Sequence, residues 1–79
     1  MKTKRLAAIV ANPRHVRFAD AVAAARQLGF TASGGAGSHR AFARKDEPIG
    51  LNFQNRDGFI VPYQARQLIA MIEKYGDLS

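Results

Sequence analysis

The residues best suited to chemistry are gathered in residues 34–40, which read Gly-Gly-Ala-Gly-Ser-His-Arg. Three glycines in four positions allow the backbone to turn tightly and to approach a ligand closely. A hydroxyl, an imidazole and a guanidinium follow directly: Ser38 donates or accepts hydrogen bonds, His39 exchanges a proton near neutral pH, and Arg40 is a permanent cation. This grouping suits a phosphodiester, although a plain hairpin turn followed by an exposed strand has the same composition.

Other side chains add candidate contacts to a polyanion. Arg17 and Arg26 fall off the apolar stripe of an expected helix and should face water, where they either bind phosphate or are simply solvated. Tyr63 and Arg66 begin the last expected helix, and Tyr63 can stack on a base or pack against the end of a sheet. His15 lies in an expected turn and is interpreted as an exposed loop residue.

The charge of the chain favours nucleic acid over membrane as the partner. Its 79 residues include twelve Lys and Arg against six Asp and Glu, which gives a formal net charge of +6. The basic character is concentrated near the N-terminus, because residues 1–28 hold six basic side chains and Asp20 as their one acid. A solvated helical surface would produce the same excess.

Composition also excludes several classes of protein. The chain has no cysteine, which rules out disulfides and thiolate metal sites, and two isolated histidines do not form a zinc set. We therefore expect neither metal nor cofactor. The apolar run after the basic N-terminus is short, and no segment approaches the length that spans a bilayer, so a cytoplasmic location is expected. Nucleotide hydrolysis is disfavoured, because the glycine-rich stretch lacks the Gly-Lys-Ser/Thr ending of a P-loop.

Hydrophobic periodicity predicts three helices. Residues 2–11 form a short helix that ends before Pro13, and residues 18–28 carry an apolar stripe at spacings of three and four. Gly29 is expected to cap the second helix in the left-handed conformation. The third helix begins at Pro62 and ends near Gly76.

The middle of the chain predicts short strands over residues 30–33, 38–45 and 49–54, with a further short extended run at residues 59–61. The order of the elements indicates a single α+β domain over residues 1–79, an antiparallel sheet covered on one face by helices. If Phe42 packs toward the helices, His39, Ala41 and Ala43 lie on the open face, with room for a strand of RNA. If the phase is reversed, His39 sits at the edge of the core.

Four blocks of sequence resemble the HicA family of small bacterial toxins. They are Leu-Gly-Phe at residues 28–30, Gly-Ser-His at residues 37–39, Leu-Asn-Phe-Gln at residues 51–54 and Pro-Tyr-Gln-Ala-Arg-Gln-Leu at residues 62–68. The resemblance covers most of the chain, in the family's order. It implies a double-stranded-RNA-binding-domain-like fold, cleavage of mRNA and neutralisation by a co-encoded HicB-like antitoxin. Three departures are Arg40, where many relatives carry a second histidine, Ala41, where a bulky aliphatic residue is often found, and an N-terminal extension at residues 6–14.

The resemblance places the family's catalytic histidine at His39, preceded by Gly37 and Ser38. A single histidine suffices as general acid and base without a metal, because RNA supplies its own 2′-hydroxyl nucleophile. Arg40 and the N–H groups of the glycine turn are expected to hold the phosphate. The expected function is thus a metal-independent endoribonuclease toxin. The alternatives are a non-catalytic RNA-binding module of the same fold, or an interaction protein whose sheet face holds a partner.

Overall fold

The computed structural model describes residues 2–76, with the side chains of residues 4–76. Its elements follow in the order α1 (Lys2–Ala11), α2 (Phe18–Gln27), β1 (Thr31–Gly34), β2 (His39–Ala43), β3 (Leu51–Gln54) and α3 (Pro62–Tyr75). The expected α+β class, with helices on one face of a three-stranded antiparallel sheet, is confirmed. In the part of the chain described, no helix is both long and apolar enough to cross a membrane.

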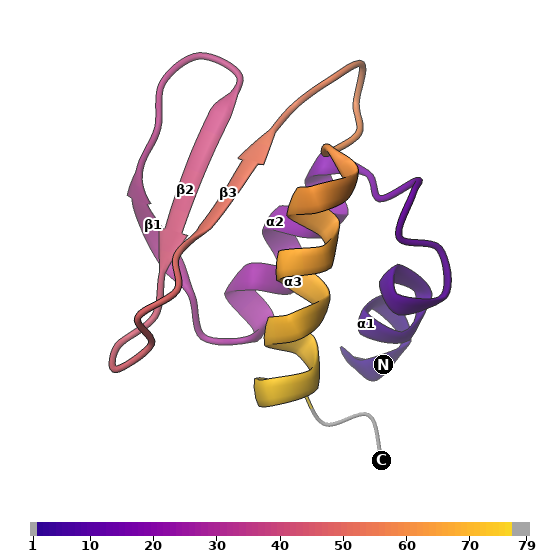
Figure 1. Cartoon of the computed structure of the whole chain (residues 1–79), viewed down its shortest axis with the longest axis horizontal. Helices are drawn as coiled ribbons and strands as arrows, with labels where there is room; N and C mark the ends of the chain where they lie inside the picture. The colour runs from indigo at the N-terminus through magenta and orange to yellow at the C-terminus, as the bar shows by residue number, and fades with distance from the viewer. Residues whose placement is uncertain (1, 77–79) are drawn as a thin grey trace.

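The elements form successive layers, which Figure 1 shows from the side of the helices. The strands pair antiparallel in the order β1-β2-β3. Helices α2 and α3 pack against one face of this sheet, and α1 packs on α2 and α3 at the side away from the strands. No helix within residues 2–76 covers the opposite face of the sheet.

The core fills the space between the sheet and the helices. Phe30, Phe42 and Phe53 are almost completely buried there, and Leu6 and Ile9 join α1 to the same cluster. Among the described residues, the large aliphatic side chains of Val10 and Ile49 are exposed. Val10 is one residue beyond Ile9 and so points away from the apolar stripe of its helix. Ile49 falls within the strand expected over residues 49–54, but it is exposed because β3 begins only at Leu51.

The end of α2 has the predicted glycine cap. Gly29 has a φ of 91°, its N–H donates to the carbonyl of Arg26, and the N–H of Phe30 donates to the carbonyl of Ala25. This is the Schellman arrangement, in which a left-handed residue satisfies the last carbonyls of a helix. It turns the chain so that the buried Phe30 leads directly into β1.

The beginning of α3 is tied to the end of β3. The side-chain oxygen of Gln64 accepts hydrogen bonds from the backbone N–H groups of Gln54, at 3.0 Å, and Val61, at 3.2 Å. Gln64 is buried, so these bonds satisfy a polar side chain that would otherwise be costly to bury. They hold the first turn of α3 beside the strand that pairs with β2.

Candidate functional site

His39 is the first residue of β2, and the turn from β1 delivers it there. The N–H of His39 donates to the carbonyl of Ala36 at 3.1 Å, which closes the turn. Gly35 has a φ of 121°, and a Cβ at this position would overlap the carbonyl oxygen of His39. A side chain at residue 35 is therefore excluded both by conformation and by space, and the glycine fixes how the chain enters β2.

The phase of β2 is the one that exposes the imidazole. Phe42 is buried between the sheet and the helices, so His39, Ala41 and Ala43, at alternate positions, belong to the opposite face. His39 is exposed. Of the two phases that the sequence left open, the structure has the one in which Phe42 packs toward the helices and His39 lies on the open face.

The side chains around His39 on the open face are uncharged. His39 pairs with Gln54, and Ala41 pairs with Asn52 on β3 and with Gly34 on β1. Cross-strand partners have Cβ atoms about 5 Å apart, so the amide of Gln54 lies beside the imidazole and that of Asn52 one step further. These two amides were not among the sequence candidates, although the burial of Leu51 and Phe53 places them on this face. We call His39, Asn52 and Gln54 the open-face site.

Within the described residues, the side chain of His39 makes no hydrogen bond or ion pair, so it does not help to hold the fold together. A histidine buried for stability would be hydrogen-bonded and enclosed. The imidazole is thus available to a ligand that approaches the open face.

Ser38 and Arg40 flank His39 but do not share its orientation. Arg40 follows His39 on the strand and pairs with the buried Phe53, so its exposed side chain leaves the backbone toward the helix side of the sheet. Ser38 and Gly37 lie in the exposed turn, where the carbonyl of Ser38 accepts the N–H of Asn55 at 2.9 Å. Arg40 can therefore approach a phosphate at His39 only around the end of the sheet.

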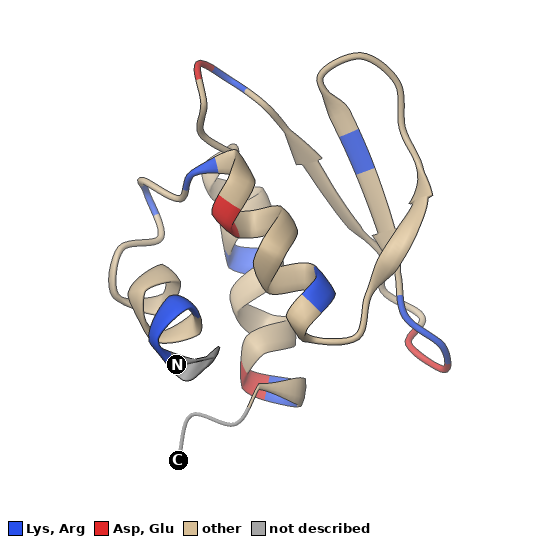
Figure 2. Ribbon diagram, turned by 180° about the vertical axis from the view of Figure 1, so that it is seen from behind, with Lys and Arg blue, Asp and Glu red and all other residues tan. Residues whose placement is uncertain are grey.

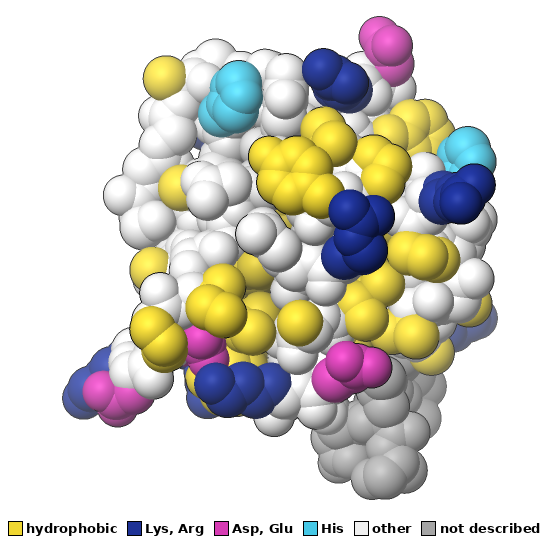
Figure 3. Space-filling view, in the orientation of Figure 1, with side chains coloured by type: hydrophobic (Ala, Val, Ile, Leu, Met, Phe, Trp, Pro, Cys, Tyr) yellow, Lys and Arg dark blue, Asp and Glu magenta, His cyan; other side chains and the backbone are white. Residues whose placement is uncertain are grey.

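Tyr63 and Arg66 are brought close to this end of the sheet. Both are exposed in the first turns of α3, next to the Gln64 that bonds to Gln54. The Tyr63 residue is 53% exposed, which leaves its ring accessible for stacking. Figure 3 shows exposed apolar and basic side chains together on the upper part of this face, with histidine side chains on either side.

Arg17 and Arg26 lie away from His39. Arg17 precedes α2 and its guanidinium stacks 5.6 Å from the ring centroid of Phe59, in the loop between β3 and α3. Arg26 is in the last turn of α2, at the end of the sheet opposite to His39. His15 is exposed, as expected, and its ring contacts Phe59 edge-on at 6.1 Å between centroids.

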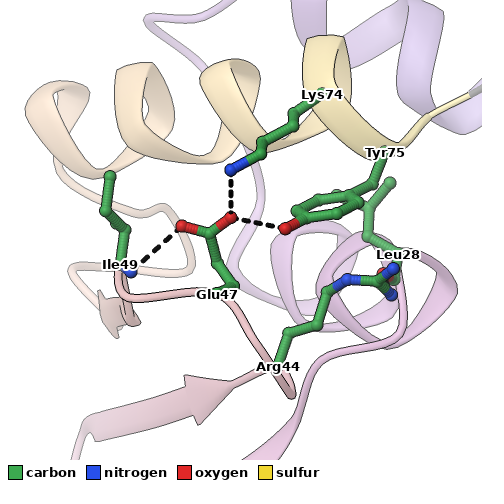
Figure 4. A network of polar contacts seen from close by, with 6 residues as sticks. All are labelled: Leu28, Arg44, Glu47, Ile49, Lys74 and Tyr75. Carbon is green, nitrogen blue, oxygen red and sulfur yellow. Dashed lines mark hydrogen bonds and ion pairs between the residues drawn. The ribbon is translucent and has the colours of Figure 1, made fainter.

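A second polar cluster lies at the end of the sheet opposite to His39 (Figure 4). It was not predicted from the sequence. Glu47 accepts hydrogen bonds from Lys74 Nζ at 2.7 Å, from the Tyr75 hydroxyl, and from the backbone N–H of Ile49 at 3.0 Å. Its carboxylate is buried although Lys74 is half-exposed. The bonds from Lys74, Tyr75 and Ile49, in that order of effect, lower the pKa of Glu47 to about 2, and the same carboxylate raises the pKa of Lys74.

Arg44 completes this cluster. Its guanidinium lies 3.9 Å from the ring centroid of Tyr75 and donates to the carbonyl of Leu28 at 2.8 Å. The cluster therefore joins the end of α2, the loop between β2 and β3, and the end of α3. No sequence signal announces it, because its members are far apart along the chain. The buried Nε of Arg44 has no hydrogen-bond partner among the described residues, but the carboxylate of Glu47 is bonded to three donors, which indicates a structural role for the cluster.

In the part of the chain that the structure covers, no three His, Cys, Asp or Glu side chains are grouped so that they could hold a metal ion. No protein-family model, curated protein or solved structure matches this chain. Its function must be inferred from its own residues and their geometry.

Proposed function

We propose that this protein is an endoribonuclease that cleaves mRNA through His39, acting as the toxin of a HicA-like pair with a HicB-like antitoxin. The resemblance of residues 28–30, 37–39, 51–54 and 62–68 to that family motivates the proposal. The order α2-β1-β2-β3-α3, with both helices on one face, supports the double-stranded-RNA-binding-domain-like fold that the resemblance implies. Such an enzyme works in the cytoplasm, where mRNA is found.

The observation that carries the proposal is the setting of His39. An exposed imidazole, without a hydrogen-bond or ion-pair partner among the described residues, stands at the mouth of a glycine turn, and its neighbours on the same face of β2, Ala41 and Ala43, have small side chains. Small neighbours leave room for a ribose-phosphate chain to lie along the strands. The net charge of +6 supplies the attraction for that chain.

In the proposed reaction His39 takes the proton from the ribose 2′-hydroxyl. The 2′-oxygen forms a bond to phosphorus while the bond from phosphorus to the 5′-oxygen breaks, and that oxygen receives a proton from the imidazolium or from water. The amides of Gln54 and Asn52 donate hydrogen bonds to the phosphate oxygens, and Arg40 adds positive charge from the edge of the sheet. The products are a 2′,3′-cyclic phosphate and a 5′-hydroxyl.

A second function, a non-catalytic RNA-binding module, is favoured by one feature. Catalytic histidines are commonly oriented by a carboxylate or carbonyl that bonds the second ring nitrogen. The described residues provide no such hydrogen bond to His39. In this case the basic surface and Tyr63 would hold RNA without cutting it.

The test is to incubate the purified chain with single-stranded RNA in excess EDTA and to analyse the ends of the fragments. The proposal predicts cleavage with 5′-hydroxyl ends, because the 2′-hydroxyl replaces both metal and external nucleophile. Salt-dependent RNA binding without any cleavage would support the binding module instead. Cleavage that requires a divalent ion would refute the proposed mechanism.

A further inference from the structure

A groove runs between α1 and the beginning of α2, on the far side of the helices from the sheet. Its volume is about 830 Å³, within the range of pockets that bind small ligands. Residues of α1, of the turn after it and of the first part of α2 line this groove: Lys4, Arg5, Ala8, Ile9, Ala11, Asn12, His15, Val16, Arg17 and Asp20. We call this feature the α1–α2 groove.

Positive charge dominates the groove. Lys4, Arg5 and Arg17 face the single acid Asp20, and Figure 2 shows the basic residues of α1 and of the beginning of α2 along this side of the molecule. Among the described residues the only ion pair joins Lys74 and Glu47, far from the groove. None of the three cations is therefore neutralised by an ion pair, and together with Asp20 they leave the groove with a formal net charge of +2 that attracts an anionic ligand.

The groove also presents planar groups. The exposed His15 ring and the Arg17 guanidinium both contact the ring of Phe59. Imidazole rings and guanidinium planes stack on unpaired bases, and the amide of Asn12 can hydrogen-bond to a base edge. Cations for phosphates beside planes for bases are the combination that binds single-stranded nucleic acid.

One loop connects the groove to the open-face site. The residues between β3 and α3 bond to both: Asn55 donates to the carbonyl of Ser38, and Gly58 accepts the N–H of Phe18, next to Arg17. The same loop carries the exposed Arg56, whose N–H and carbonyl pair with Phe59. Arg56 thus adds a cation to the loop that is bonded on one side to the turn before His39 and on the other to the beginning of α2.

We infer that the α1–α2 groove binds a second stretch of the RNA strand that is cleaved at His39, with Arg56 contacting the backbone between the two places. This inference rests on the proposed function and extends it, because it makes the substrate a single strand long enough to pass over the loop end. The N-terminal helix α1 then serves to lengthen the RNA site. An acidic protein segment is the competing occupant of a groove with this charge.

The test measures how the full-length His39→Ala chain, which binds without cutting, holds a fluorescent single-stranded RNA of about 12 nucleotides, a length typical of such sites. Lys4→Glu and Arg5→Glu are compared with Lys45→Glu, an equal change of charge at an exposed position in the loop between β2 and β3. Each groove variant should bind about tenfold more weakly near physiological salt, and its slope of log K against log salt should fall by about 0.7. Lys45→Glu should stay within about twofold, because charges farther away than about 8 Å are screened.

Equal affinities for the groove variants and Lys45→Glu would overturn the inference and leave the proposed function standing. The same holds if RNA affinity is kept but a neutralising protein partner is no longer bound, which would assign the groove to that protein. If no form binds RNA, the proposed function fails together with the inference.

Discussion

At the scale of single residues, the chain uses two polar side chains in opposite ways. Glu47 is buried and bonded to Lys74, Tyr75 and Ile49, so its charge is committed to holding the fold. His39 is exposed and has no such bond in the described chain, so its imidazole remains available to react. Removing the first should change stability, whereas removing the second should change activity.

The lowered pKa of Glu47 predicts how the stability of the protein depends on pH in acid. Its pKa is about 2 in the folded chain and 4.5 when unperturbed, so the unfolded state binds a proton first as the pH falls. The stabilisation from this carboxylate is complete above pH 4.5 and is lost progressively toward pH 2. Thermal unfolding followed by circular dichroism should show Tm falling through this interval.

The matched variants are Glu47→Gln and Glu73→Gln. Glu47→Gln should lower Tm at pH 7 and flatten its decline in acid, because the amide cannot replace the charge that Lys74 and Tyr75 contact. Glu73 is exposed on α3, and its replacement should leave the curve unchanged. A Glu47→Gln protein with the wild-type pH profile would show that the cluster does not govern acid stability.

At the scale of elements, the sequence pattern predicted each helix and strand to within about two residues, because apolar spacing, Pro62 and Gly29 are local signals. The alternation in β2 also placed His39 once Phe42 was buried. Composition alone grouped Arg40 with His39 as a phosphate contact. Because neighbouring residues of a strand point to opposite faces, Arg40 lies on the other face of the sheet. The Glu47 cluster was not predictable, because it depends on contacts between elements that only the folded chain brings together.

The turn between β1 and β2 gives a test of how His39 is positioned. Gly35→Ala should destabilise the protein by about 1–3 kcal/mol, the cost of a strained backbone residue, and should reduce RNA cleavage by displacing the start of β2. Gly34→Ala is the control, since no atom lies within 4 Å of a Cβ there. Urea unfolding and cleavage rates should separate the two variants, and equal behaviour would mean that the turn is not shaped around Gly35.

At the scale of the whole molecule, the Glu47 cluster and the open-face site lie at opposite ends of the fold. The Glu47 cluster fastens the ends of α2 and α3 to the loop between β2 and β3, while His39, Tyr63 and Arg56 stand at the other end. The uncovered sheet face gives a partner protein direct access to the open-face site. Neutralisation can therefore work by covering His39.

A HicB-like antitoxin should accordingly protect this face. Amide exchange of the complex should slow in residues 34–42 and in β3, while the loop that holds Glu47 stays unchanged. Masking requires contact at the site, so full neutralisation with protection confined to the Glu47 end would indicate an indirect mechanism instead.

The most direct measurement is the cleavage rate of His39→Ala on single-stranded RNA, with His15→Ala as the control. Loss of a general acid and base should slow cleavage by at least about a hundredfold. Tm should stay close to wild type, because an exposed side chain contributes about 0.5 kcal/mol or less. RNA affinity should persist, since it depends on distributed positive charge. At saturating RNA, His15→Ala should cleave at the wild-type rate, because His15 lies in the α1–α2 groove and takes no part in the chemical step. A folded His39→Ala protein that also cleaves at that rate would contradict the assignment of His39 as the catalytic residue.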